Sequence, residues 1–122
     1  MNKIIKPILT LLVFVLFLSC EKKEEKIACF NDDPFEVEWL NEIRQNMIDE
    51  GPSDFGTRSI VMYTYKGNKV FEVNSCIMCN DQGVSITDCN KVNICYFGGL
   101  TGANTCPDFY DTYTDKEVIF SL

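Results

Sequence analysis

The sequence predicts an α+β domain in which one N-terminal helix packs on a small antiparallel sheet, followed by a loop-rich, disulfide-stabilised second half. Three observations lead to this class. An amphipathic stretch follows Asp33, and the turn Gly67-Asn68 separates two alternating apolar segments. Beyond Cys76 the pattern breaks into short strand-like pieces separated by turn residues. The 122 residues are enough for one domain and little more.

Residues 1–19 have the pattern of a signal peptide. Lys3 and Lys6 precede residues 8–18, which are apolar except for Thr10, and this run is too short to span a membrane permanently, because a spanning helix needs about 20 apolar residues. The run ends in Ser19-Cys20, which resembles the lipobox of bacterial lipoproteins. In such signals the cysteine is lipidated and becomes the new amino terminus. We therefore predict lipid attachment at Cys20, since two or more acyl chains hold a protein stably at a membrane.

Residues 20–28 are predicted to form a charged tether. Every residue from 21 to 26 is charged, and such a run stays solvated because it cannot be buried. The segment Lys23-Glu24-Glu25 is similar to short signals that send some lipoproteins to the outer face of the outer membrane, and a plain spacer is an equally good interpretation. We expect a bacterial cell envelope location, favour the outer membrane, and leave periplasmic and surface-exposed placement open.

The domain predicted for residues 29–122 starts with the helix. Asp33 is the expected N-cap, Pro34 suits the first helical position, and Glu36 completes a capping-box pattern. The apolar stripe consists of Leu40, Ile43 and Met47, widened by Val37 and Trp39. Gly51-Pro52 is expected to end the helix.

A β-hairpin is predicted next, with strands at 59–66 and 69–73 around Gly67-Asn68. Two-residue closure there pairs Thr64 with Phe71. The face expected to meet the helix carries Ile60, Met62, Phe71 and Val73. The other face is expected to be a more amphipathic cover, and it carries Tyr63, Tyr65 and Glu72.

The second half is predicted to contain shorter elements. Residues 84–87 and 92–96 indicate two brief strands around a turn at 88–91. Glycines at 98, 99 and 102 indicate a loop over 98–104, and residues 117–120 are consistent with a final strand.

The cysteines are the most informative residues for chemistry. With Cys20 assigned to lipid, six remain: Cys29, Cys76, Cys79, Cys89, Cys95 and Cys106. An even number in an exported chain predicts three disulfides, and fifteen connectivities are possible. We expect Cys29 to tie the helix entry to the second half and the others to join the region 76–106. Each native bridge in a small secreted domain contributes about 2–5 kcal/mol.

Composition excludes several function classes. The chain has no histidine, which excludes Ser-His-Asp and Cys-His catalysis and histidine metal sites. The net charge is −7, and removal of Lys3 and Lys6 with the signal makes it −9, which argues against a nucleic-acid partner. The carboxylates Asp108, Asp111 and Asp115 lack the pattern of a calcium loop. We expect no enzyme activity, metal or cofactor.

A binding module for an unidentified protein or small-molecule ligand is therefore the leading functional hypothesis, with the membrane contacted through the lipid. Three alternatives remain, and one of them is a small hydrolase that uses carboxylates. Small cystine-rich exported domains often present a rigid loop to proteases, and residues 97–104 between Cys95 and Cys106 are such a candidate. The spacing of Cys76 and Cys79 is that of a thiol-redox motif, although it follows a hairpin strand instead of preceding a helix.

Several short motifs together resemble a family of small uncharacterised bacterial lipoproteins. The motifs lie at residues 65–73, 88–95, 98–102 and 106–109. The resemblance implies an exported, lipid-anchored domain. It implies no activity and no catalytic residue.

Overall fold

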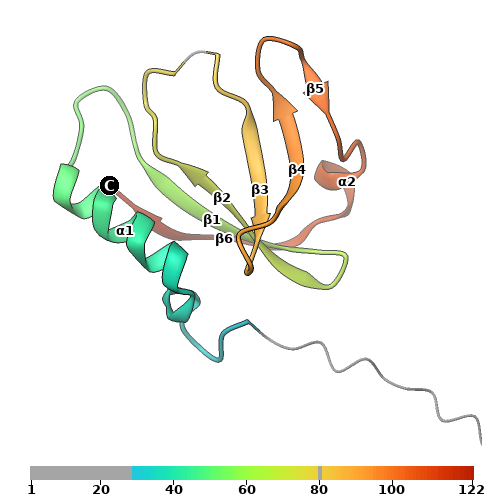
Figure 1. Ribbon diagram of the computed structural model, residues 1–122, viewed down its shortest axis with the longest axis horizontal. Coiled ribbons are helices and arrows are strands. Elements are labelled where there is room, and N and C mark those ends of the chain that lie inside the picture. The colour runs from blue at the N-terminus through green and yellow to red at the C-terminus, as the bar shows by residue number, and fades with distance from the viewer. Residues whose placement is uncertain (1–28, 80) are drawn as a thin grey trace, which may run out of the picture.

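A single antiparallel sheet of six strands organises the domain in the computed structural model, which describes residues 29–79 and 81–122. The strands lie in the order β5-β4-β3-β2-β1-β6, and helix α1 packs against the sheet (Figure 1). This arrangement confirms the predicted α+β class. The elements in chain order are η1 (Pro34–Glu36), α1 (Glu38–Glu50), β1 (Ser59–Tyr65), β2 (Asn68–Asn74), β3 (Val84–Asp88), β4 (Asn93–Gly98), β5 (Ala103–Asn104), α2 (Phe109–Thr112) and β6 (Thr114–Ser121).

The α-helix begins later than the sequence predicted. Asp33 caps the short 3₁₀ turn η1, where its carboxylate accepts from the Phe35 N–H at 2.9 Å. Glu36 does not complete a capping box with Asp33; its carboxylate accepts from the Asn31 N–H at 3.1 Å. The chain is extended at Val37 (φ −73°, ψ 111°), so α1 starts one residue further on. The predicted end is confirmed, because Gly51 has a φ of 74° and donates to the carbonyl groups of the last turn.

The hairpin forms, but its predicted register is wrong. Tyr65 pairs with Asn68 and Thr64 with Lys69, so the two turn residues are Lys66 and Gly67. Both have positive φ, 48° and 77°, as in a type I′ turn, which favours glycine at its second central position. The shift amounts to two residues, so the same side chains still share a face.

The face predicted to meet the helix does so. Ile60, Met62 and Phe71 pack with Leu40 and Met47 of α1 in one buried cluster. Trp39 packs edge-to-face on Phe71, with ring centroids 5.9 Å apart. The apolar stripe of α1 therefore buries itself against β1 and β2, as its periodicity indicated.

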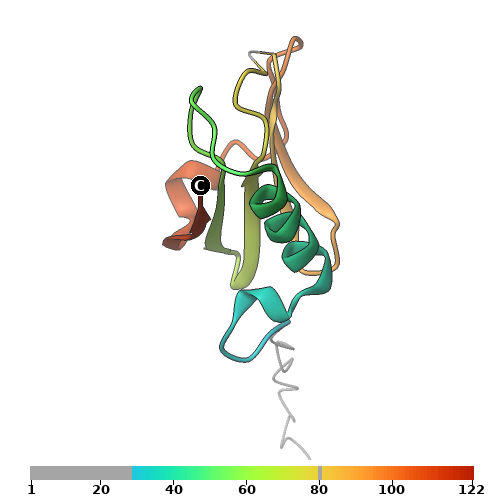
Figure 2. The same ribbon diagram turned by 90° about the vertical axis from the view of Figure 1, so that its left-hand side faces the viewer.

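The opposite face of the hairpin is not the amphipathic cover that was expected. Tyr63 and Tyr65 are buried there with Phe97 and Phe109 in a second cluster. Figure 2 shows why, since the chain around α2 lies on the side of the sheet opposite α1. The Phe109 ring stacks edge-to-face on both tyrosines, at centroid distances of 5.3 Å and 5.0 Å. The sheet is thus covered on both faces by elements from opposite ends of the sequence.

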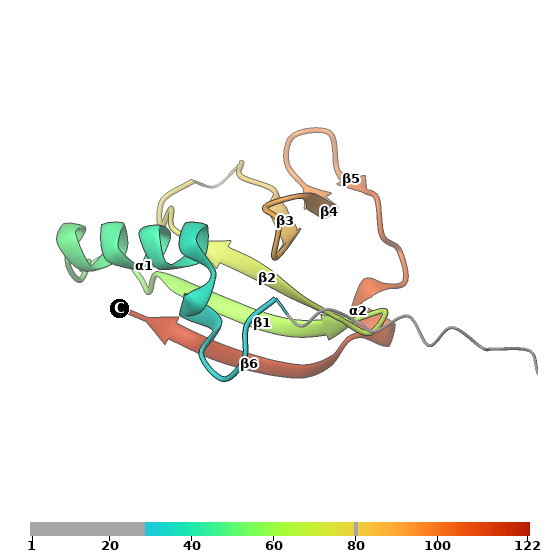
Figure 3. The same cartoon turned by 60° about the horizontal axis from the view of Figure 1, so that its bottom comes forward.

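The second half continues the sheet. Strands β3 and β4 pair antiparallel, with an irregularity after Ile86, and Figure 3 shows them rising out of the plane formed by β6, β1 and β2. Strand β5 pairs with β4 through only two residue pairs. Strand β6 pairs with β1 on its other side from β2, and two register shifts interrupt that pairing. The short β5 and the irregular β6 therefore form the two edges, a feature that discourages edge-to-edge association.

Three disulfides are present, as the cysteine count predicted, and the structure supplies the pairing that the sequence left open. Cys29 joins Cys89, which ties the segment before α1 to the turn between β3 and β4. Cys95 joins Cys106 across eleven residues, and Cys76 joins Cys79 within the β2–β3 loop. Only the first bridge connects distant parts of the chain, with a sequence separation of 60.

Candidate functional site

The two ends of the sheet differ in their connections. At one end, which we call the turn end, tight turns join β1 to β2 and β3 to β4. At the other end, the loop end, three other connections project from the sheet (Figures 1 and 2). They are the α1–β1 loop (residues 51–58), the described parts of the β2–β3 loop (75–79 and 81–83) and the β4–β5 loop (99–102). Antiparallel topology brings these loops to the same end although they are far apart in sequence.

Each of the three loops carries one strongly exposed apolar side chain. Leu100 is 87% exposed, Phe55 72% and Met78 68%, and these are the three most exposed large hydrophobic residues in the described part of the chain. Single exposed apolar residues are ordinary on a protein surface. Exposed apolar surface often marks an interaction site, so the loop end, which carries three such side chains, is the candidate binding surface.

Contacts between neighbouring loops hold this end together. The position that a side chain on Gly56 would take lies 2.7 Å from Ile77 Cγ2, so the α1–β1 loop packs directly on the β2–β3 loop. Arg58 strengthens that junction, because its Nε donates to the Ser75 carbonyl at 3.3 Å. Only glycine leaves room for so close an approach at position 56.

Tyr96 connects the β2–β3 and β4–β5 loops. Its ring and hydroxyl occupy the space that a side chain on Gly83 would need, and its hydroxyl lies 2.6 Å from the corresponding position on Gly99. Its backbone N–H donates to the Thr105 hydroxyl at 2.8 Å, and the nearby Cys95–Cys106 bridge joins β4 to the segment after β5. The loop that presents Leu100 is therefore supported from both sides.

Charge is distributed unequally between the two ends. All four lysines of the domain lie at or near the turn end: Lys66, Lys69, Lys91 and Lys116. The three loops carry Asp54 and Asp81, both exposed, and one basic residue, Arg58. Arg58 forms an ion pair with Glu50 at 3.1 Å and is largely buried. The loop end therefore combines three exposed apolar side chains with two exposed carboxylates.

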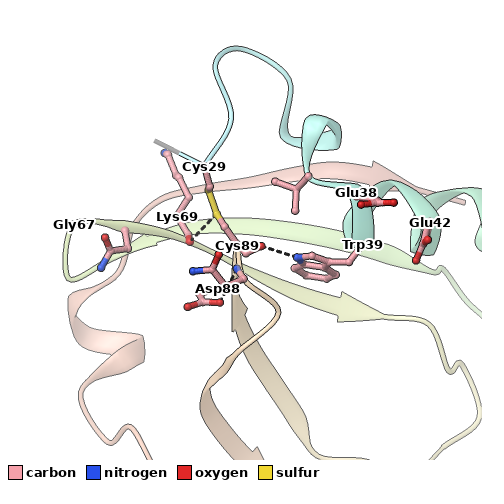
Figure 4. Close-up of a pocket in the computed structure, with 11 residues that line it drawn as sticks. Cys29, Glu38, Trp39, Glu42, Gly67, Lys69, Asp88 and Cys89 are labelled. Atoms are coloured by element: carbon pink, nitrogen blue, oxygen red, sulfur yellow. Dashed lines mark hydrogen bonds between the residues drawn. A yellow bond between two sulfur atoms is a disulfide. The ribbon is translucent and has the colours of Figure 1, made fainter. Parts of the chain in front are cut away.

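The turn end contains an open cavity of about 1010 Å³ between the start of α1 and the two turns (Figure 4). The Trp39 indole N–H points across it and donates to the Cys89 carbonyl at 2.9 Å. Glu38 and Glu42 lie on its helical side, and Lys69 lies on the opposite side. The Asp88 carboxylate is already used by the turn, because it accepts from two backbone N–H groups at 2.9 Å. The hydrogen bonds of the residues that line this cavity stabilise the fold, because they join α1 to the β3–β4 turn and close that turn.

Of the carboxylates named in the sequence analysis, Asp108 takes part in structural contacts. Asp108 accepts from the Tyr65 hydroxyl at 2.9 Å and lies 3.9 Å from the Lys66 ammonium group. No group of three or more metal-ligating side chains occurs in the described residues. Within residues 29–79 and 81–122, no helix has the length and apolar character needed to cross a bilayer. Cys20 lies outside the described residues.

One ionisable pair is built into the tyrosine-rich core. The Tyr63 hydroxyl donates to a Glu72 carboxylate oxygen at 2.7 Å. Burial and this hydrogen bond both raise the pKa of Tyr63 well above its usual range, since each disfavours the phenolate. The pair therefore fixes a buried tyrosine in its neutral form and does not prepare it for proton transfer near neutral pH.

A family model described as a domain of unknown function, DUF6970, matches residues 46–122, which is more than half of the chain. The chain belongs to the DUF6970 family. No curated protein and no solved structure matches it. The DUF6970 region contains the whole sheet and all three projecting loops, whereas Cys29 and most of α1 precede it.

Sequence reasoning did not find the three apolar residues at the loop end of the DUF6970 domain. Phe55, Met78 and Leu100 each stand among turn-forming residues, and that local signal was available. The sequence did not show that their three loops project from the same end of the sheet, because that depends on which strands are neighbours. The sequence did indicate Leu100 indirectly, through the candidate loop 97–104.

Proposed function

We propose that this DUF6970 protein is a lipid-anchored lipoprotein of the bacterial cell envelope that acts as a binding module. The observation that carries the binding role is the loop end, where three connections display the most exposed large apolar side chains of the described residues. The proposal assigns no catalytic residue. The residues proposed to take part are the lipid attachment residue Cys20 and the exposed loop side chains.

The place where the chain enters the domain supports a lipid anchor together with binding at the loop end. The described chain begins at Cys29, and the Cys29–Cys89 bridge holds it at the turn between β3 and β4. A lipid on Cys20 therefore tethers the domain by its turn end through the short charged segment 21–28. The loop end is then the end of the domain opposite the tether, where a partner can reach it. We favour the outer membrane, because Lys23-Glu24-Glu25 is similar to known sorting signals.

Replacement of Cys20 tests the anchor. We expect Cys20→Ala to move the protein from the membrane fraction to the soluble envelope fraction or the medium. Intact-mass measurement of the wild type should show cleavage before Cys20 and the added mass of acyl chains. A membrane-bound Cys20→Ala protein, or a wild-type mass without acyl chains, would contradict the lipoprotein proposal.

A protease inhibitor is the second candidate, favoured by the loop at residues 97–104. Leu100 stands at the exposed tip of this loop, and the Cys95–Cys106 bridge closes its base. An inhibitor of this kind should slow at least one member of a protease panel at micromolar concentration, and Leu100→Gly should abolish the effect. If no protease is slowed, the loop serves another partner.

The thiol-redox alternative depends on Cys76 and Cys79, which are bridged and exposed at the loop end. A redox role requires that this bridge be reduced readily and reversibly by a mild dithiol. Alkylation of the free thiols followed by mass mapping measures the fraction of the Cys76–Cys79 bridge that has been reduced. A bridge that resists mild reduction would assign Cys76 and Cys79 to structural support of the loop.

A further inference from the structure

We propose that the loop end binds a protein partner whose own apolar patch is bordered by lysine or arginine side chains. This inference rests on the binding-module function proposed above and adds the chemical class of the partner.

The apolar tips define the centre of the surface. Phe55, Met78 and Leu100 come from three different loops and are all more than two thirds exposed. They contribute little to the interior of the domain in this arrangement. Burial against a partner removes their surface from water, and apolar and aromatic side chains at the centre of an interface carry most of its binding energy.

The loops are organised before any partner binds. Ile77 packs against Gly56, Tyr96 packs against Gly83 and Gly99, and Arg58 ties the first loop to Ser75. The Cys76–Cys79 bridge further restricts the segment that presents Met78. Loops held in this way lose less conformational freedom on binding, which favours affinity.

The charge distribution selects the kind of partner. Asp54 and Asp81 are exposed on the same loops as Phe55 and Met78, and the one basic residue there, Arg58, is paired with Glu50. An anionic membrane surface is disfavoured, because acidic side chains are repelled from it and because the lysines lie at the opposite end. A protein patch with basic residues around an apolar centre matches both features.

Two synthetic amphipathic peptides with the same leucine- and phenylalanine-rich face test the proposal. One carries lysine on its polar face and the other glutamate. The full-length chain is reconstituted in phosphatidylcholine nanodiscs, with empty nanodiscs as the blank, and binding is followed by fluorescence anisotropy of the labelled peptide. We expect the lysine peptide to bind at least about tenfold more tightly than the glutamate peptide, with the difference shrinking at high salt. Equal binding of the two peptides would overturn the proposal.

Substitutions locate the contact. Phe55→Ser and Leu100→Ser should each weaken binding of the lysine peptide about tenfold, and Asp54→Asn with Asp81→Asn should weaken it about threefold at low salt. Val118→Ser is the matched control, because Val118 is also an exposed apolar residue, 58% exposed on β6. An unchanged affinity in the loop variants, or an equal loss in the control, would overturn the assignment.

Two further outcomes separate this inference from the proposed function. Binding to phosphatidylglycerol vesicles that is lost in Leu100→Ser would identify the loop end as a lipid-binding surface and overturn the protein-partner proposal. The lipoprotein proposal is judged only by the Cys20→Ala fractionation and the intact mass. A failed peptide experiment with a released Cys20→Ala protein thus rejects the partner class and leaves the anchor standing.

Discussion

The turn end and the loop end are built on the same strands but are held in different ways. At the turn end, short turns and a bridge with a sequence separation of 60 join the segment before α1 to the sheet. At the loop end, a bridge with a separation of 3 restrains a single loop, and apolar side chains remain exposed. The difference indicates that the turn end stabilises the fold, whereas the loop end presents a surface. Four predictions test this division.

The largest difference is expected between two disulfides. Removal of the Cys29–Cys89 bridge by Cys29→Ser with Cys89→Ser should lower the free energy of unfolding by about 4 kcal/mol, because a long loop of unfolded chain is no longer closed. Removal of the local bridge by Cys76→Ser with Cys79→Ser should cost at most about 2 kcal/mol. Denaturant titration of both double variants measures the values. Equal losses would contradict the assignment of stability to the turn end.

The contact between Tyr96 and Gly83 can be tested as a support of the β2–β3 loop. Gly83→Ala places a methyl group into the space of the Tyr96 ring, and such overpacking costs about 1–3 kcal/mol. Gly83→Ala combined with Tyr96→Ala should cost less than the sum of the two single changes, because the clash is absent when the ring is removed. A double-mutant cycle by denaturant titration measures the coupling. Additive effects would show that Tyr96 does not hold the β2–β3 loop.

The buried Tyr63–Glu72 pair predicts a stability change in alkali. The pKa of Tyr63 is raised in the folded state, so the unfolded chain loses its proton first, near pH 10. The contribution of Tyr63 to the free energy of unfolding is therefore complete below about pH 10. Above that pH it decreases by about 1.4 kcal/mol per pH unit. In Tyr63→Phe this part of the alkaline slope should be absent, as followed by denaturant titration between pH 9 and 11. An unchanged slope in the variant would exclude Tyr63 as its source.

The smallest effect is expected at the apolar tips. Phe55→Ser and Leu100→Ser remove side chains that are mostly exposed, and surface substitutions of this kind change stability by less than about 0.5 kcal/mol. Thermal unfolding of each variant measures the change. Leu40→Ala, which truncates a fully buried residue of α1, is the contrasting control with an expected loss of about 2–5 kcal/mol. A loss above about 1 kcal/mol at a tip would mean that the tips serve folding and not recognition.

Local patterns predicted most of the elements. The spacing of Leu40, Ile43 and Met47 identified the helix, and the alternation around Gly67 identified the hairpin and its helix-facing side. The predicted register of the β1–β2 hairpin was wrong. A type I′ turn favours glycine at its second central position, so the turn residues are Lys66 and Gly67 and Asn68 lies in the strand. The burial of Tyr63 was missed because the covering residue, Phe109, is 46 positions later in the chain.

By itself, the sequence determined the class of fold and the presence of three bridges, because periodicity and residue count can be taken from the chain without its tertiary contacts. The signal peptide and tether that it indicates before the domain stay predictions. The tertiary structure alone decided which cysteines pair, which face of the hairpin is buried by α2, and which loops lie at the same end of the sheet. Those features depend on the order β5-β4-β3-β2-β1-β6, and strand order arises from contacts between residues far apart in sequence. The loops that carry Phe55, Met78 and Leu100 project from the same end of the sheet for that reason.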